Sequence, residues 1–236
     1  MYDRTAEAYD VFFAARGKDY AAEAEHVADL IRECRPEART LLDAACGTGV
    51  HLSHLRDHFD VEGVDGSPAM LARARHRVPG APLHEGDLRT FDLGRRFDAV
   101  TCLFSSIAYL VPAEELRRGV ANLARHLVDG GVLVVEPWVF PDAWEPGPLP
   151  RVDSAEGDDL TVTRMTWVRT EGRRSLLDMH WLIGSPTGVE HVPEHHETFL
   201  YTDEEYREAF TAAGCSAELD PEGLIGRGLY VCVKGG

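Results

Sequence analysis

Short apolar runs alternate with amphipathic segments along the first 137 residues. Each run has the length of a buried β-strand, and apolar residues in the segments between them recur every three or four positions, as on one face of a helix. The runs lie at 41–45, 59–65, 82–84, 98–104 and 132–136. Strands that alternate with helices of this length predict an α/β fold with a parallel sheet and right-handed crossovers.

The pattern changes after residue 137. Between 138 and 201 there is no helical period, and residues 160–169, 175–183 and 189–201 alternate as antiparallel strands do. A capping box, Thr202 to Glu205, then begins a helix that ends near Gly214, and two closing strands follow at 215–219 and 228–233.

These patterns predict one mostly parallel, seven-stranded sheet with helices on both faces and an inserted antiparallel β-subdomain. The predicted main domain comprises residues 1–137 and 202–236, and the predicted insertion, 138–201, roofs a pocket at the sheet.

Composition narrows the choice of partner and compartment. The formal net charge of −16 argues against nucleic acid or an anionic membrane as a partner. No apolar run is long enough to cross a membrane, and residues 1–20 are too charged for a signal peptide. The five cysteines have no metal-binding spacing, so we expect reduced thiols in a cytoplasmic protein.

The segment 41–52, Leu-Leu-Asp-Ala-Ala-Cys-Gly-Thr-Gly-Val-His-Leu, joins the first strand to a helix through Gly47 and Gly49. Such a turn lets a ligand approach bare backbone. A nicotinamide site uses a similar turn, but Leu52 stands where its third glycine would be. The segment resembles motif I of the class I methyltransferases, which have a Rossmann-like fold and use S-adenosylmethionine.

Acidic residues follow the next two strands, at the edge of the sheet where ligands bind. Asp65 is placed to accept the ribose hydroxyls, and Asp87 the adenine amino group. Residues 2–19 are read either as a packing helix or as a lid that covers the cofactor. The complete predicted cofactor set is Tyr9, Arg16, Lys18, Ala45, Gly47, Thr48, Gly49, Asp65, Gly66, Met70, Asp87, Leu88 and Leu103.

Five segments, one of which is the glycine turn described above, occur in an order that resembles a narrower family. They are Gly17–Tyr20, Ala45–Gly49, Phe104–Tyr109 (Phe-Ser-Ser-Ile-Ala-Tyr), Glu136–Trp138 and Gly226–Leu229. Together they resemble the dTDP-aminosugar N,N-dimethyltransferases that make desosamine and mycaminose in macrolide biosynthesis. The resemblance implies that the amine of a dTDP-3-amino-3,6-dideoxyhexose is methylated twice, by a homodimer that needs no metal.

Residues near the predicted substrate are assigned with their structural alternatives. Tyr109 orients the amine or only packs, and Glu136 holds the amine or a sugar hydroxyl. Arginine forks match phosphate oxygens, so Arg164 and Arg227 are candidates for the diphosphate. The complete predicted catalytic and substrate set is Tyr2, Ser106, Tyr109, Glu136, Trp138, Arg164 and Arg227.

Other readings stay open at this point. The histidines at 191, 195 and 196 suggest a metal, but Pro193 disfavours the helix that would pair His191 with His195. An N- or O-methyltransferase of another small molecule, such as glycine, is a second possibility. A methyltransferase-fold protein that binds a partner without catalysis is a third.

Overall fold

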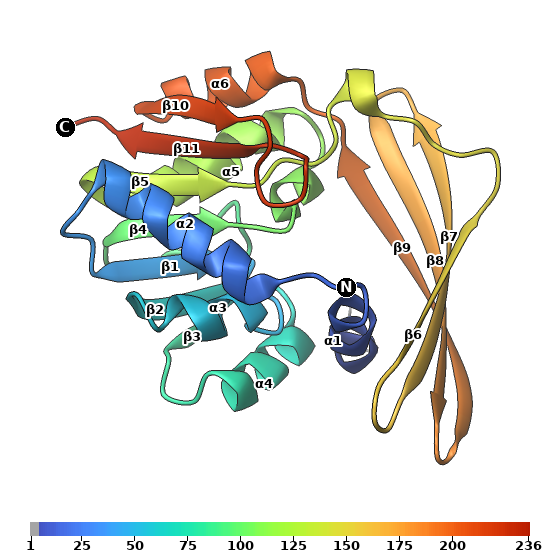
Figure 1. Cartoon of the computed structure of the whole chain (residues 1–236). Helices are drawn as coiled ribbons and strands as arrows, with labels where there is room; N and C mark the ends of the chain where they lie inside the picture. Colours follow the sequence, from blue (N-terminus) through green and yellow to red (C-terminus); the bar gives the residue numbers. More distant parts are fainter. Residues whose placement is uncertain (1–4) are drawn as a thin grey trace.

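The computed structural model describes residues 5–236 and contains two sheets (Figure 1). The larger has seven strands in the order β10-β11-β5-β4-β1-β2-β3. Its strands are β1 (Thr40–Ala44), β2 (Asp60–Asp65), β3 (Leu83–Glu85), β4 (Phe97–Cys102), β5 (Leu127–Val135), β10 (Cys215–Asp220) and β11 (Leu229–Lys234). Only β11 runs antiparallel to its neighbours β5 and β10. The predicted mostly parallel, seven-stranded sheet is confirmed.

Apolar clusters cover both faces of this sheet. Helices α2 (Tyr20–Cys34) and α3 (Val50–Leu55) contribute to one cluster, and α5 (Glu114–Arg125) and α6 (Asp203–Ala212) to the other. α4 (Pro68–Arg77) is capped at its N-terminus by Ser67, whose hydroxyl accepts from the Met70 N–H. Because the parallel strands are buried on both sides, their carboxyl ends are the open edge at which a site can form.

The second sheet has four antiparallel strands, β6 (Arg151–Glu156), β7 (Thr161–Glu171), β8 (Arg174–Ser185) and β9 (Gly188–Phe199). The sequence predicted only the last three. β6 has one buried residue, Ala155, so it lacks the apolar alternation that identifies a strand. Helix α1 (Ala6–Ala14) lies between the two sheets in Figure 1, where Phe12 packs 5.3 Å from Trp181 of β8.

β5 also begins earlier than its apolar run. The apolar run predicted a strand at 132–136, whereas the strand already begins at Leu127. Leu127 pairs with Phe97, and the register shifts before Ala99 pairs with Val132. Residues 129–131 therefore form an irregularity within the strand.

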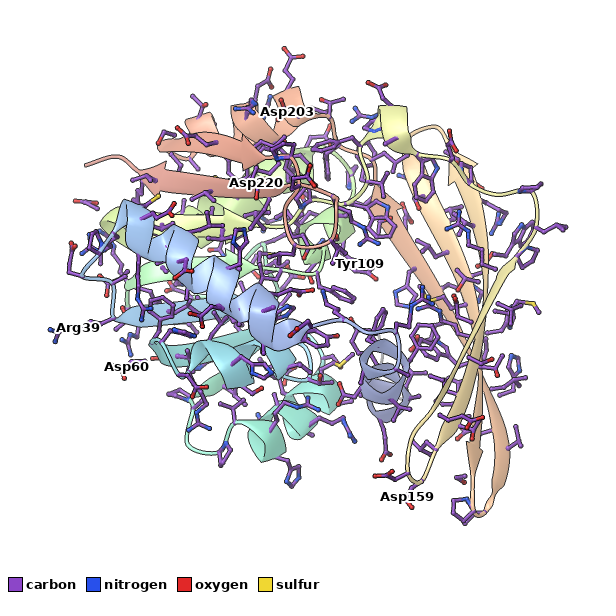
Figure 2. The ribbon with its side chains drawn as sticks, in the orientation of Figure 1. Arg39, Asp60, Tyr109, Asp159, Asp203 and Asp220 are labelled. Atoms are coloured by element: carbon purple, nitrogen blue, oxygen red, sulfur yellow. The ribbon has the colours of Figure 1, made fainter. Side chains whose placement is uncertain are left out.

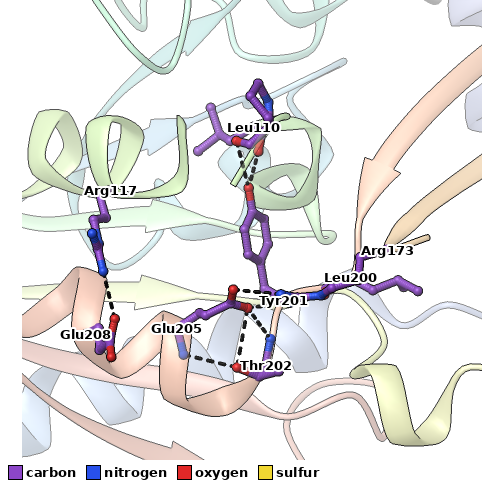
Figure 3. Close-up of polar contacts among 9 residues, drawn as sticks. Leu110, Arg117, Arg173, Leu200, Tyr201, Thr202, Glu205 and Glu208 are labelled. Atoms are coloured by element: carbon purple, nitrogen blue, oxygen red, sulfur yellow. Dashed lines mark hydrogen bonds and ion pairs between the residues drawn. The ribbon is translucent and has the colours of Figure 1, made fainter. Parts of the chain in front are cut away.

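The start of α6 joins the two sheets and matches the prediction. Thr202 and Glu205 form the capping box, and Glu205 also pairs with Arg173 (Figure 3). The hydroxyl of Tyr201 donates to the carbonyl oxygen of Leu110 in the same region.

Within residues 5–236, no helix is both long and apolar enough to cross a membrane.

Candidate active site

The glycine turn after β1 depends on left-handed backbone. Ala45, Gly47 and Gly49 have φ of 59°, 57° and 76°. Gly49 caps α3, and a Cβ there would lie 3.1 Å from the Cβ of Ala74 on α4. Gly49 is therefore needed for close helix packing. It was predicted to bind the cofactor, but it does not line the cavity above the turn.

That cavity, called here the turn cavity, has a volume of about 300 Å³ and lies at the carboxyl ends of the strands. Bare backbone, acidic side chains and apolar side chains all line this cavity. Most predicted cofactor residues line it: Tyr9, Ala45, Gly47, Thr48, Asp65, Gly66, Met70, Asp87, Leu88 and Leu103.

Three carboxyl groups on this wall have different environments. Burial raises the pKa of Asp43 to about 7, and burial also raises the pKa of Asp65, although backbone N–H groups oppose it. The N–H groups of Gly47 and Ser67 each donate to Asp65 at 2.8 Å. Hydrogen bonds from Arg89 lower the pKa of Asp87. A cation in the cavity would favour ionisation of both buried acids.

A second cavity, of about 610 Å³, lies between the main sheet and the four-stranded sheet, and it is called here the sheet cavity. Of the predicted substrate residues, Ser106, Tyr109, Trp138, Arg164 and Arg227 line this cavity. The predicted Tyr2 lies outside the described residues. The second sheet thus supplies one wall of this cavity.

The two arginines are held in different ways. The guanidinium of Arg227 lies 4.5 Å from the Trp138 ring, and Nη1 donates to Ser105 at 3.3 Å. Arg164 lies 4.2 Å from the ring of Phe12 and 4.0 Å from Asp153. Arg227 is therefore oriented by an aromatic face and a hydroxyl, which leaves most of its donors for other partners.

The two cavities meet. Tyr9, Phe104, Ser106 and Tyr109 line both of them. Figure 2 shows Tyr109 pointing into the space between the two sheets. Molecules bound in the two cavities can therefore touch beside the Tyr109 hydroxyl.

A strained loop forms this junction. Phe104 and Ser105 both have left-handed backbone, with φ of 55° and 59°, which costs free energy in non-glycine residues. The Phe104 N–H donates to Glu136 at 2.6 Å, and the Ser105 hydroxyl donates to the Pro137 carbonyl at 2.7 Å. These bonds hold the loop in its strained form.

The placement of Glu136 corrects a prediction. Glu136 was expected to hold the amine or a sugar hydroxyl, but it is 0% exposed and lines neither cavity. Burial raises its pKa, against the opposing charge of Lys18. Because Glu136 directly follows β5 with its side chain turned inward, it supports the Phe104 backbone instead.

Lys18 and Arg16 also differ from prediction. Both line the sheet cavity and not the turn cavity. Lys18 lies 2.6 Å from Glu23, and Arg16 lies 2.5 Å from Asp153. Each cation thus pairs with an acid of this chain, which accounts for its position away from the glycine turn.

Helix α1 is fastened over the turn cavity by Asp10. Thr48 donates to Asp10 at 2.6 Å, and Arg77 and Arg73 of α4 lie 2.7 and 3.2 Å from the same carboxylate. Both arginines therefore pair with an acid of another helix instead of projecting freely into solvent. The contact joins residues far apart in the chain, so helical spacing gave no sign of it.

Sequence reasoning missed Tyr20 and His51, which line the turn cavity. Their rings lie 4.9 Å apart, and His51 Nε2 lies 2.7 Å from Glu23, a buried acid. Tyr20 lies in the segment Gly17–Tyr20 and His51 in the segment 41–52, both described above. The sequence did not indicate that Glu23 of α2 is buried, so it gave no reason to place His51 beside it. Among residues 5–236, no group of three or more His, Cys, Asp or Glu is arranged to hold a metal ion.

Comparison with known proteins agrees with this geometry. Residues 41–131 match a family described as a methyltransferase domain. The dTDP-3-amino-3,6-dideoxy-α-D-glucopyranose N,N-dimethyltransferase of Streptomyces fradiae is 47% identical over 98% of this chain and 91% of its own. The dTDP-3-amino-3,4,6-trideoxy-α-D-glucopyranose N,N-dimethyltransferase of Streptomyces venezuelae is also 47% identical, over 97% of both chains.

Solved structures give the same grouping. The crystal structure of DesVI from Streptomyces venezuelae superimposes with a TM-score of 0.92 at 46% identity, over 98% of both chains. CalS10 of Micromonospora echinaspora, an amino pentose methyltransferase solved with bound S-adenosylmethionine, gives 0.86 at 44% identity, over 97% of both chains. With this fold, two cavities that meet, and these near full-length relatives, the chain belongs to the S-adenosylmethionine-dependent sugar N,N-dimethyltransferases.

Proposed function

We propose that this enzyme methylates the amino group of a dTDP-3-amino-3,6-dideoxyhexose twice, in the biosynthesis of a natural-product sugar. The observation that carries the proposal is the junction of two cavities at Tyr9, Phe104, Ser106 and Tyr109. One cavity has the acids and glycine turn suited to the methyl donor. The other has arginines and an aromatic ring suited to a nucleotide sugar.

The turn cavity fits S-adenosylmethionine. Asp43 and Asp65 line its wall, and both are buried carboxyl groups that a cationic ligand would stabilise in the charged form. Met70 and Leu103 supply apolar surface for an adenine ring. When bound there, S-adenosylmethionine supplies an electrophilic methyl group.

The sheet cavity supports the nucleotide-sugar part of the proposal. Arg227 is desolvated, which lowers its pKa, and a buried guanidinium is stabilised by an anion such as a diphosphate. Trp138 beside it offers a flat surface for a sugar or thymine ring. We therefore propose that residues 138–201 act as a roof over the substrate, carried by the unit formed by 1–137 and 202–236.

The residues at the junction contribute mainly position. The rate gain from holding two reactants in line reaches many orders of magnitude, whereas proton transfer contributes roughly 10²–10⁴-fold. The Glu136 and Pro137 bonds to the Phe104–Ser105 loop fix the wall on which the amine must rest. The Tyr109 hydroxyl is placed to accept a hydrogen bond from a neutral amine.

Mass spectrometry of the purified protein with S-adenosylmethionine and dTDP-3-amino-3,6-dideoxyglucose tests the proposal. We expect a product heavier by two methyl groups. A product with one methyl group would keep the substrate class and refute dimethylation. No product, together with no calorimetric binding of dTDP, would refute the nucleotide-sugar assignment and favour another small-molecule acceptor.

The oligomeric state is part of the proposal. Val152, Met165, Trp167 and Leu182 are each about half exposed on the outer face of the four-stranded sheet. Val152 of β6 pairs with Met165 of β7, so these two side chains are neighbours on that face. An apolar patch of this kind is typical of a protein interface. We propose a homodimer that buries it, and sedimentation of Trp167→Asp should then show a monomer.

The cysteines support a cytoplasmic location. Cys46, Cys102, Cys215 and Cys232 are buried free thiols, and burial raises the pKa of each. Protonated, scattered thiols are typical of proteins that work in a reducing compartment. Fractionation of the producing cells would test this part.

A further inference from the structure

A chain of three polar side chains leads away from the junction of the cavities. The Tyr109 hydroxyl lies 3.0 Å from Nδ1 of His196, on β9. Nε2 of His196 lies 3.4 Å from Oε2 of Glu194. The His196 side chain is only 1% exposed, so the imidazole at the centre of this chain is shielded from water.

The partners of Glu194 fix the direction of these hydrogen bonds. Its carboxylate accepts from the Thr5 hydroxyl at 2.7 Å and from the Trp181 Nε1–H at 3.0 Å. Burial opposes its ionisation, but hydrogen bonds from His196 and Thr5 hold the pKa of Glu194 below its usual value. A carboxylate can only accept, so Nε2 of His196 carries the proton.

It follows that Nδ1 of His196 accepts the hydrogen bond from Tyr109. The Tyr109 oxygen then presents acceptor capacity where the two cavities meet. Among residues 5–236, the titratable groups in contact with His196 include Tyr109 of η1 (Ser106–Tyr109) and Glu194 of β9, while β8 presents Leu177 opposite it. Arg164 of β7 lies on the Trp181 ring beside Glu194.

We propose that Tyr109, His196 and Glu194 form a relay that removes the proton from the methylated amine before the second methyl transfer. The inference rests on the proposed function and deepens it. Tyr109 touches the amine, whereas His196 and Glu194 act through Tyr109 as positioning residues.

The step balances as follows for one turnover. The nitrogen lone pair forms the new N–C bond, the S–C bonding pair stays on sulfur, and the nitrogen becomes an ammonium. Its N–H proton passes to the Tyr109 oxygen while the Tyr109 hydroxyl proton passes to Nδ1 of His196. The resulting imidazolium pairs with the Glu194 carboxylate, and the amine is neutral again.

The variant His196→Asn distinguishes a proton relay from a purely structural role of His196. The asparagine Oδ1 can replace Nδ1 as an acceptor for Tyr109, but it cannot take up a proton. We expect the rate of the second methylation to fall about a hundredfold at neutral pH. Monomethylated product should accumulate, and the rate should recover as pH rises, because the free amine then loses its proton to solvent. The KM for the nucleotide sugar should change little.

The matched control is His195→Asn. His195 is the next residue on β9, but its side chain is 74% exposed and pairs with Asp178 on the other face. We expect wild-type rates and product ratios from this variant. If His196→Asn also gave dimethylated product at the wild-type rate with an unchanged pH profile, the relay would be refuted.

A second measurement does not depend on turnover. Nitrogen-15 NMR of histidine in the protein without added ligand should show His196 protonated at Nε2, and Glu194→Gln should change that signal. A proton on Nδ1 in the wild type would overturn the relay. If the wild type methylated no amino sugar, the proposed function would fail, while the NMR result would still decide how the three side chains are connected.

Discussion

The hydroxyl of Thr48, on the glycine turn, donates a hydrogen bond of 2.6 Å to Asp10 of α1. Arg77 and Arg73 of α4 pair with the same carboxylate. One acid thus ties the N-terminal helix to two elements that border the turn cavity. Since Tyr9 on this helix lines both cavities, α1 forms part of the wall of each.

Asp10→Ala should therefore weaken cofactor binding. Loss of the anchor lowers the fraction of molecules in which α1 is docked on the glycine turn, and a ligand that needs the docked helix binds less tightly in proportion. We expect the Kd for S-adenosylmethionine to rise about tenfold, equivalent to about 1.4 kcal/mol. Glu7→Ala is the control, because Glu7 is exposed and lies 3.9 Å from Arg73. Calorimetry showing the same Kd for both variants would contradict an anchoring role.

Asp65 should contribute to binding of the cofactor, and Arg227 should contribute to binding of the nucleotide sugar. Asp65 lines only the turn cavity and Arg227 only the sheet cavity. We expect Asp65→Ala to raise the cofactor Kd more than tenfold and to leave dTDP binding within about threefold, with the opposite result for Arg227→Ala. Calorimetry with each ligand measures this. Equal loss of cofactor binding in both variants would refute the division.

The sheet and its binding edge could be predicted because their signals are local. Asp65 ends β2 and Asp87 lies two residues after β3, and parallel strands bring their carboxyl ends to one edge. The apolar periodicity that identifies a strand was missing from β6, whose side chains are mostly exposed and which buries only Ala155. A strand that presents polar residues on both faces has no periodicity to detect.

Contacts between residues far apart in the chain were the second feature that the sequence did not predict. Tyr109 and His196 are 87 residues apart in the chain, and Thr48 and Asp10 are 38 apart. Neither pairing follows from the spacing of residues in one element. The side-chain direction of Glu136 failed for a related reason: it depends on where β5 ends, and the boundaries of elements are the least predictable feature of a sequence.

Gly49 and Gly47 should differ in their tolerance of a methyl group. Both have positive φ, so alanine costs about 1–2 kcal/mol at either position. At Gly49 the new Cβ would also lie 3.1 Å from Ala74, whereas at Gly47 it would meet nothing within 4 Å. Such crowding adds about 1–3 kcal/mol. Urea denaturation should therefore show a larger loss for Gly49→Ala, and equal losses would refute the packing argument.

Asp43 should make stability depend on pH. It is fully buried at the end of β1, it accepts a hydrogen bond of 2.8 Å from Thr101, and burial raises its pKa to about 7. An unfolded aspartate titrates near 3.9, so the folded state binds the proton more tightly. The stabilisation is therefore complete below about pH 4 and is lost as pH rises through about 7.

The loss attributable to Asp43 is on the order of 4 kcal/mol between pH 4 and pH 8, from about three pKa units. Asp43→Asn keeps an acceptor for Thr101 and has no charge, so its free energy of unfolding should fall less over this range. Asp60→Asn, at the exposed start of β2 (Figure 2), should keep the wild-type dependence. Denaturation at pH 4 and pH 8 measures all three proteins. If Asp43→Asn lost as much stability as the wild type, another group would control the titration.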